Sequence, residues 1–478
     1  MNKQLSNYSV SALLLSCLAA CAVGPDYQKP DVAMPKGWQT NTSFHPAEPS
    51  DGVLKGNWWE MFGDEQLNQL EQQAAQHNQS LVVAAERLNQ ARLQVTASSS
   101  IQLPQVDLQA SDARFKTSAN RPLAVYGMPN SSVVQNNPQL GFAVGYEADL
   151  FGRVRRVVEG VKAAEGQATA DFENTKLMLM SDLAADYFNL RELDVEIDIV
   201  EKGVVLQAKA LDFIRIRHDL EAASGLDLAE QQALLDTNKT QLVLLQNQRS
   251  SVQNALSTLT GTPAPEFKLA PQVVKLVAPS LPVGLPADVL QRRPDVASAE
   301  RAMAVANANI GVARAAYYPT IMLQANGGWD SNQMANLFNA PSILWSLGAG
   351  LTQHLFDAGK TTANVKIAES SYVAATANYR QSVLIAMQEV QTGIDSMAIL
   401  NGANHQAEAA EASSARVLEL ANDRYTGGLD IYLNVISAQQ SLLASQRQAV
   451  QIHGQQMLNA VYLVKALGGG WQGMVAAH

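Results

Sequence analysis

Histidine and cysteine are the side chains of this protein best suited to metal binding or nucleophilic chemistry, and the histidines form no recognisable site. The seven histidines lie at positions 45, 77, 218, 354, 405, 453 and 478, without the short spacings that zinc sites use. The sequence also has no nucleophile elbow, phosphate-binding loop or dinucleotide fingerprint. We therefore expect no catalytic residue, no metal site and no cofactor.

One cysteine lies in a pattern that predicts a modification. Residues 1–20 have a basic start and an apolar stretch too short to span a bilayer, as export signals do. The sequence Leu-Ala-Ala-Cys at 18–21 resembles the lipobox of bacterial lipoproteins, which implies cleavage and lipidation at Cys21. Because residue 22 is not Asp, the resemblance also implies the outer membrane. An ordinary signal peptide with an incidental cysteine is the alternative.

Composition narrows the class of protein. The formal net charge is −10 and no basic cluster occurs, so a nucleic-acid partner is not expected. Charged residues make up 16% of the chain, against about 25% in typical soluble domains. No run of 18 apolar residues follows the signal, which excludes a helical membrane span. If the chain crosses a membrane, it does so as β-strands.

The spacing of the 18 prolines predicts unusually long helices. None lies between residues 139 and 262, and none follows Pro341. Proline inside a helix removes an amide donor and clashes with the preceding turn, at a cost of roughly 3 kcal/mol. The proline-free tracts therefore allow helices at about 152–217 and 358–424, each roughly 100 Å long.

Internal matches indicate a tandem duplication. Ala85-Glu86-Arg87 recurs 214 positions later, and six further residues recur 207 positions later. Each copy has the order helix, strand, loop, strand, very long helix, turn, helix. The pairs separated by 207 are Arg217/Arg424, Leu226/Leu433, Gln232/Gln439, Leu235/Leu442, Leu256/Leu463 and Gly261/Gly468.

Four segments alternate apolar residues with small or polar ones, at about 105–112, 140–147, 319–326 and 343–352. This period of two is typical of half-buried strands, and it also suits membrane strands that face lipid on one side and a wet lumen on the other. Strands span a bilayer only as closed barrels of at least eight strands. Three copies would supply 12 strands and two copies eight.

Several motifs together resemble the outer-membrane efflux duct family, which is TolC-like, and its lipoprotein branch of NodT type. The resemblance covers essentially the whole chain after the signal. It implies an α+β membrane protein, in which the duplicated repeat gives four strands of a trimeric 12-stranded barrel and long helices of a periplasmic α-barrel. The motifs are Val-Gly-Pro-Asp-Tyr at 23–27, Trp58-Trp59, Phe62-Gly63-Asp64, Arg293-Pro294-Asp295, 313–319, and Arg424-Tyr425 with Gly428.

The resemblance also implies a function and partners. Family members are passive ducts of tripartite efflux systems that export small toxic molecules or drugs. The expected partners are two further copies in a homotrimer, a periplasmic adaptor, a proton-driven inner-membrane pump and outer-membrane lipid. A pore-less periplasmic coiled-coil scaffold or adaptor lipoprotein is the alternative function, but it leaves the four alternating segments unexplained.

The expected segments follow from the signal, the repeats and the proline-rich connection. They are a signal peptide at 1–20, a lipid-anchored segment at 21–60, a first repeat at 61–262, a linker at 263–285, a second repeat at 286–470 and a tail at 471–478.

In this family the duct closes at the periplasmic tip, where the long helices turn. The matching turns are at about 217–228 and 424–437. By position, Leu433 corresponds to an apolar constriction ring in relatives, and ordinary packing is the alternative.

Two departures from the family pattern affect the expected gate. Relatives often carry an Asp one turn after this leucine and an Arg shortly beyond it, whereas this chain has Ser437 and Gln440. Asp423 and Asp430 lie at the same tip and are candidates for a displaced acidic ring. Solvated surface charge is the alternative for both.

Overall fold

The computed structural model describes residues 22–30, 35, 37–39, 57–119, 132–279 and 293–469. The chain divides into two compact units. The first comprises Met1–Pro30, Leu88–Ala168 and Ala299–Asn378, and the second comprises Asp31–Arg87, Thr169–Ser298 and Tyr379–His478. Each unit contains segments of both sequence repeats, so the repeats are interleaved in space.

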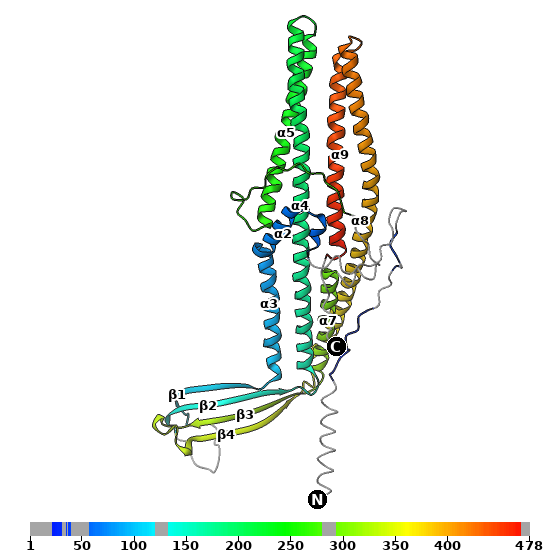
Figure 1. Cartoon of the computed structure of the whole chain (residues 1–478). Coiled ribbons are helices and arrows are strands. Elements are labelled where there is room, and N and C mark those ends of the chain that lie inside the picture. The colour runs from blue at the N-terminus through cyan, green and yellow to red at the C-terminus, as the bar shows by residue number, and fades with distance from the viewer. Residues whose placement is uncertain are drawn as a thin grey trace. The chain divides into compact units, whose positions relative to one another are not determined.

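The duplication is visible in the lengths of the long helices (Figure 1). Helices α4 (Arg153–Asp219) and α8 (Lys360–Thr426) have 67 residues each, and α5 (Gly225–Leu259) and α9 (Tyr432–Ala466) have 35 each. Each member of a pair begins 207 residues after its counterpart, which is the offset found in the sequence. Both long helices end two residues beyond the predicted position.

An aspartate lies before each long helix and accepts hydrogen bonds from backbone N–H groups at its start. The carboxylate of Asp149 accepts from Val154 and Arg155, at 3.0 and 2.8 Å. Asp357 accepts from Gly359, just before α8, and from Thr361, at 3.0 and 2.8 Å. These bonds satisfy amides that have no partner within the first helical turn.

In both copies, a side chain beside a shorter helix donates a hydrogen bond to a carbonyl at the end of a long hairpin. Helices α2 (Glu65–His77) and α3 (Gln79–Ser99) meet at Asn78, whose side chain caps α3. The Asn78 amide also donates to the carbonyl of Leu259, at 2.9 Å. In copy two, Arg293, just before α7 (Pro294–Ala315), donates to the matching carbonyl of Ala466, at 3.0 Å.

No helix in the part of the chain that the structure describes is both long enough and apolar enough to cross a membrane. Short 3-10 turns also occur at Trp58–Phe62, Ser100–Gln102, Met334–Asn336 and Ala340–Ser342.

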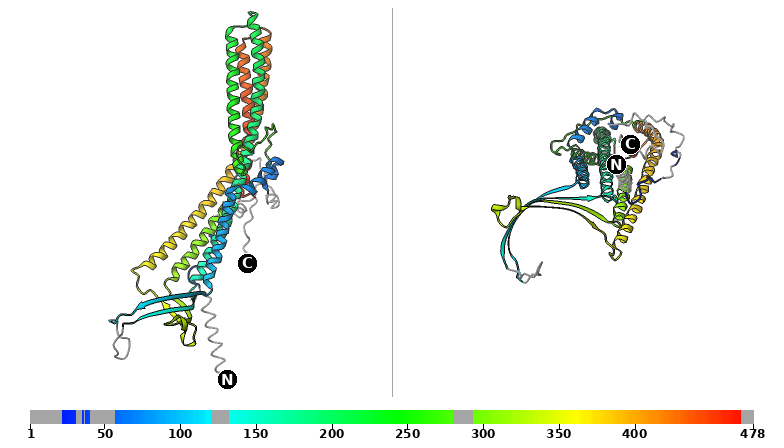
Figure 2. Two further views of the ribbon diagram at one scale, coloured as in Figure 1. Left: turned by 90° about the vertical axis from the view of Figure 1, so that its left-hand side faces the viewer. Right: turned by 90° about the horizontal axis from the view of Figure 1, so that it is seen from below.

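Four strands form one antiparallel sheet in the order β1-β2-β3-β4 (Figure 1). Seen from below, the sheet is curved (Figure 2). Its middle pair, β2 and β3, joins the two copies, and Gly141 pairs there with Gly328. A Cβ atom on Gly328 would overlap the backbone of Leu140 and Gly141, so the close approach requires glycine. The strands are Gln105–Lys116, Val134–Ala148, Thr320–Asp330 and Ile343–Thr352.

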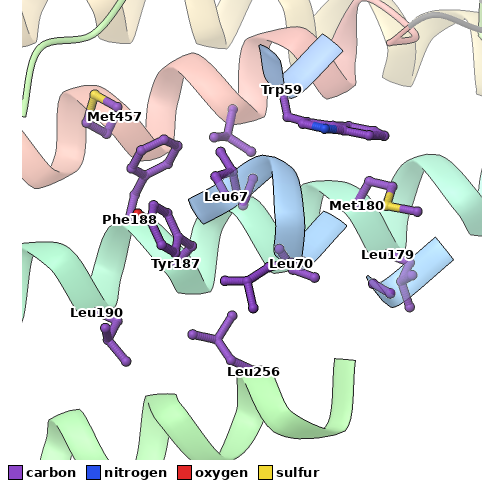
Figure 3. Packing of buried hydrophobic residues seen from close by; sticks show 14 of the residues in the cluster. Trp59, Leu67, Leu70, Leu179, Met180, Tyr187, Phe188, Leu190, Leu256 and Met457 are labelled. Carbon is purple, nitrogen blue, oxygen red and sulfur yellow. The ribbon is translucent and has the colours of Figure 1, made fainter. Parts of the chain in front are cut away.

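The largest apolar core lies in the second unit, where α2 packs against α4, α5 and α9 (Figure 3). Tyr187 of α4 lies in this core and donates to Asp64, at 2.6 Å. Asp64 in turn caps α2, so one carboxylate ties both helices together. Figure 3 labels the core residues Trp59, Leu67, Leu70, Leu179, Met180, Tyr187, Phe188, Leu190, Leu256 and Met457.

A buried polar cluster holds the start of the inter-repeat connection against α4 and α5. The side chain of Asp194 is 1% exposed and accepts hydrogen bonds from Arg191, Arg249 and the backbone N–H of Gln272. Arg249 also donates to the carbonyl of Leu269, at 2.8 Å. Because each buried charge has several partners, the cluster stabilises this connection without an uncompensated charge.

Glu71 is different, because it is fully buried on α2 and neither carboxylate oxygen has a hydrogen-bond partner among the residues that the structure describes. Burial raises the pKa of this carboxyl well above its usual value of 4.5. The folded protein therefore holds a proton that the unfolded chain releases. Stability is greatest below pH 4.5 and falls as the pH rises toward the raised pKa.

We expect Glu71→Gln to remove this pH dependence. Glu71 should contribute a fall of about 1.4 kcal/mol per pH unit to the free energy of unfolding across that window, in addition to the contribution of Glu192, whose pKa burial raises to about 7. Urea unfolding in detergent between pH 4 and pH 8 measures the slope. Glu65→Gln, at an exposed site on the same helix, is the control and should keep the wild-type slope. The Glu71→Gln protein should keep only the shallower slope that the other buried carboxyls give, and identical slopes in all three proteins would show that Glu71 does not carry this proton.

Candidate functional site

The predicted site lies where α4 turns into α5 and α8 turns into α9. The two turns share one backbone pattern: Ala222 donates to the carbonyl of Arg217 at 2.8 Å, and Leu429 donates to the carbonyl of Arg424 at 2.9 Å. The left-handed position is Gly428 in one turn and Glu221 in the other, with φ of 68° and 62°. Within this unit the helices run side by side (Figure 2).

Leu433 lies in the first turn of α9 and is 44% exposed. Its neighbours Tyr432 and Val435 are buried, so α9 has a packed face and an open face at the tip. Ser437 and Gln440 are also exposed and follow Leu433 at helical spacing. The structure thus brings Leu433, Ser437 and Gln440 onto one face.

The two candidate acidic residues have different surroundings. Asp430 is paired with Arg424, at 3.0 Å, and accepts hydrogen bonds from the Asn434 amide, at 2.6 Å, and the backbone N–H of Ile431, at 2.9 Å. The bonds from Ile431, Arg424 and Asn434 hold the pKa of Asp430 below 3.8. Asp423 is exposed on the last turns of α8. Asp430 is therefore already engaged within its turn, whereas Asp423 faces solvent.

An aromatic and cationic contact joins the two hairpins at the tip. The Arg217 guanidinium of α4 lies over the ring of Tyr425 of α8, 5.0 Å from its centroid. Tyr425 in turn contacts Tyr432 of α9, with ring centroids 4.9 Å apart. Arg217 also donates to the carbonyl of Ala222. A cation over an aromatic face is attracted by the ring quadrupole, which favours this arrangement.

A buried chain of hydrogen bonds lies beside this contact. The Tyr432 hydroxyl donates to Gln231 of α5, at 2.9 Å, and burial raises the pKa of this tyrosine to about 12. Gln231 donates to the backbone carbonyl of Gln207 in α4, at 3.0 Å, and Asn238 donates to the Gln207 side chain, at 2.8 Å. The Tyr432 hydroxyl therefore links α9 to α5, and the Gln231 and Asn238 amides link α5 to α4.

The sequence singled out Arg217 and Tyr425 only as motif or repeat residues, and it did not predict their contact. Both residues lie in the last turns of their long helices, but they are not repeat equivalents, because Arg217 matches Arg424 and Tyr425 matches His218. The Tyr432, Gln231 and Gln207 chain has no signal in the sequence. Cys21 lies outside the described residues.

The sheet has two chemically distinct faces. One row of residues that pair across all four strands consists of Val106, Val144, Ala325 and Leu347. The residues next to them along each strand point to the opposite face of the sheet. One such row is Asp107, Ala143, Asn326 and Ser346. Leu347 and Trp345 are 76% and 74% exposed. Within the described residues, one face of the sheet is apolar and open, and the other is small and polar.

The duplicated chain combines a two-faced sheet with two long helical hairpins, an architecture that suits a channel protein. The family model "Outer membrane efflux protein" matches residues 70–262 and 285–469. The chain belongs to this outer-membrane efflux protein family.

Individual relatives agree with this assignment. The chain is 31% identical to the solvent efflux pump outer membrane protein SrpC of Pseudomonas putida, over 97% of this chain and 98% of the relative. It is 28% identical to the cation efflux system protein CusC of Escherichia coli, over 95% and 97%.

Solved structures extend the similarity to the whole fold. The outer-membrane channel OprN superposes with a TM-score of 0.87 and 27% identity, over 95% of this chain and 100% of that chain. The CmeC outer membrane channel of Campylobacter jejuni gives 0.89 and 25%, over 95% and 96%. The chain is thus an outer-membrane channel component of a tripartite efflux system that reaches into the periplasm, and not a pore-less scaffold.

We expect Tyr432→Phe to loosen the tip. The change leaves the Gln231 oxygen buried without its donor, which costs about 1–3 kcal/mol. Hydrogen exchange of amides in 207–238 and 418–436 should accelerate by roughly tenfold or more, because 1.4 kcal/mol corresponds to a factor of ten. Tyr425→Phe keeps the ring beneath Arg217 and is the control, with wild-type exchange expected. Unchanged exchange in Tyr432→Phe would mean that the hydroxyl does not stabilise the tip.

Proposed function

We propose that three copies of this chain form one closed duct, with 12 strands in a membrane barrel and the long helices in a periplasmic α-barrel. Four observations support this: the single four-stranded sheet, its edge strands β1 and β4, its apolar face and its polar face. Cyclic assembly closes a sheet that one chain leaves open. The apolar face then lies against lipid and the polar face lines the lumen.

The segments proposed for the chain follow the duplication. The signal occupies 1–20 and the anchored segment 21–60, and the repeats run over 61–262 and 286–470, with a linker at 263–285 and a tail at 471–478. The two separate family matches, at 70–262 and 285–469, support this division. Cys21 is the proposed site of lipid attachment, supported by the Leu-Ala-Ala-Cys sequence at 18–21.

The proposed gate is the helical tip, with Leu433 as its apolar constriction. Three leucines that meet on the axis of a trimer would close a narrow pore partly by excluding water. The exposed position of Leu433 beside the packed face of α9 supports this role. Asp423 is the better candidate for a displaced acidic ring, because Asp430 is already paired with Arg424.

The proposed partners are a periplasmic adaptor and a proton-driven inner-membrane pump. The relatives are named for different cargoes: SrpC for solvents, TtgF for toluene, ArpC for antibiotics and CusC for cations. This diversity on one fold supports a passive conduit for small toxic molecules, with selection carried out by the pump. Antibiotic resistance is the expected phenotype where the pump accepts drugs.

We expect Leu433→Ala to open the resting duct. Removing three apolar side chains from the axis lowers the barrier to water and ions, so single-channel conductance in planar bilayers should rise. Leu226→Ala is the matched control, because Leu226 holds the equivalent first-turn position of α5. It should leave conductance unchanged. Equal conductance in wild-type, Leu433→Ala and Leu226→Ala channels would make Leu433 a packing residue.

A further inference from the structure

A short slot in the first unit holds the chain that directly follows Cys21. Residues 22–30 lie against the start of α4 and against α7 (Figure 1). The fit depends on glycine. A Cβ atom on Gly152 would come within 2.7 Å of Ala22, and one on Gly311 would come within 2.9 Å of the Val23 carbonyl. Gly24, with φ of 107°, crosses Gly311 at equally close range.

Arg156 of α4 is the central residue of this slot. Its side chain is 5% exposed, and it donates to the carbonyls of Val23 and Gly24, at 3.3 and 3.2 Å. It also pairs with Asp26, at 2.8 Å. One guanidinium thus contacts Val23, Gly24 and Asp26 of an otherwise irregular segment, which suits its planar set of donors.

α7 provides the second wall. Asn307 donates to the carbonyl of Pro25, at 2.9 Å, and Lys29 pairs with Glu300, at 2.8 Å. The Tyr27 hydroxyl donates to the same Glu300 carboxylate. Because α4 belongs to the first repeat and α7 to the second, residues 22–30 bind both repeats at once.

The slot exists once per chain although the repeat occurs twice. The residue 207 positions after Arg156 is Ala363, and the residue 214 positions before Gly311 is Ala97. Ala363 lacks the hydrogen-bond donors of Arg156, and the Cβ atom of Ala97 takes up the space that Gly311 leaves open. The duplicated scaffold has therefore acquired a feature that serves only the single N-terminal segment.

We infer that Arg156 and Gly311 make residues 22–30 a docked tether, which fixes where the lipid-bearing residue leaves the folded protein. Ala22 contacts Gly152, between β2 and α4, and consecutive Cα atoms are about 3.8 Å apart. The acyl chains of Cys21 would then enter the membrane beside the ends of the strands, close to the part of the sheet proposed to meet lipid. Arg156 is a positioning residue for the anchor. This inference rests on the proposed lipidation of Cys21.

Photocrosslinking tests the tether directly. Cells grown with an alkyne- and diazirine-bearing palmitate label Cys21, and mass spectrometry of the SDS-resistant oligomer maps crosslinks from its acyl chain. In the wild-type protein we expect crosslinks to peptides of β2 and β3 that lie near Gly152. Arg156→Ala should reduce them about tenfold, because hydrogen bonds to a charged group are lost. Lys162→Ala, at an exposed site on the same helix, is the control and should keep them.

A second variant avoids any change inside the slot. Asp26 and Lys29 are exposed, so Asp26→Ala with Lys29→Ala weakens docking from the tether side and should also reduce the crosslinks. Full labelling with an unaltered crosslink pattern in both variants would overturn the tether and leave lipidation intact. Absence of label from the wild-type protein would overturn lipidation itself, and the inference with it.

Discussion

The open edges of the four-stranded sheet are the constraint on which the rest of the protein depends. β1 and β4 each have one neighbour in the described sheet, so a row of amides and carbonyls on each is available for pairing. In a bilayer each such group costs several kcal/mol if it stays unpaired. The proposed trimer removes this cost, because β1 of one copy can pair with β4 of the next. Because each repeat contributes two strands, each copy adds an even number of strands to the ring.

The helical unit combines a firmly held region with a lightly held tip. The core around Tyr187 and the Asp194 cluster joins several helices through apolar packing and charged hydrogen bonds. At the tip, the hairpins meet through a small apolar cluster, the Arg217–Tyr425 contact and the Tyr432 hydroxyl. Regions with few buried contacts open at the lowest free energy. The tip is therefore the part of this unit best suited to change shape while the rest stays folded.

Local patterns in the sequence predicted the elements, and long-range contacts escaped prediction. The proline-free tracts predicted α4 and α8 to within two residues at each end. This was possible because proline disrupts the helical turn in which it lies, so its effect can be predicted from local sequence. The offset of 207 also predicted equal helical hairpins. The contact of Asn78 with Leu259 was not predicted, because the two residues lie 181 positions apart in the sequence. The same holds for the contacts of Arg156 with Val23 and Gly24, which lie more than 100 residues before it, and for Glu71, whose isolation in the core has no sequence signature.

Disulfide trapping between neighbouring copies tests the proposed assembly most directly. Cys21 is the only cysteine left after the expected cleavage, and lipidation blocks its thiol, so introduced pairs report alone. Ser346→Cys in β4 would be combined in turn with Gln105→Cys, Asp107→Cys, Gln109→Cys or Ser111→Cys in β1, and the membranes oxidised. Our account predicts that at least one pair gives a covalent trimer on denaturing gels and no larger species. A ladder that stops at the dimer, or one that continues beyond three copies, would contradict it.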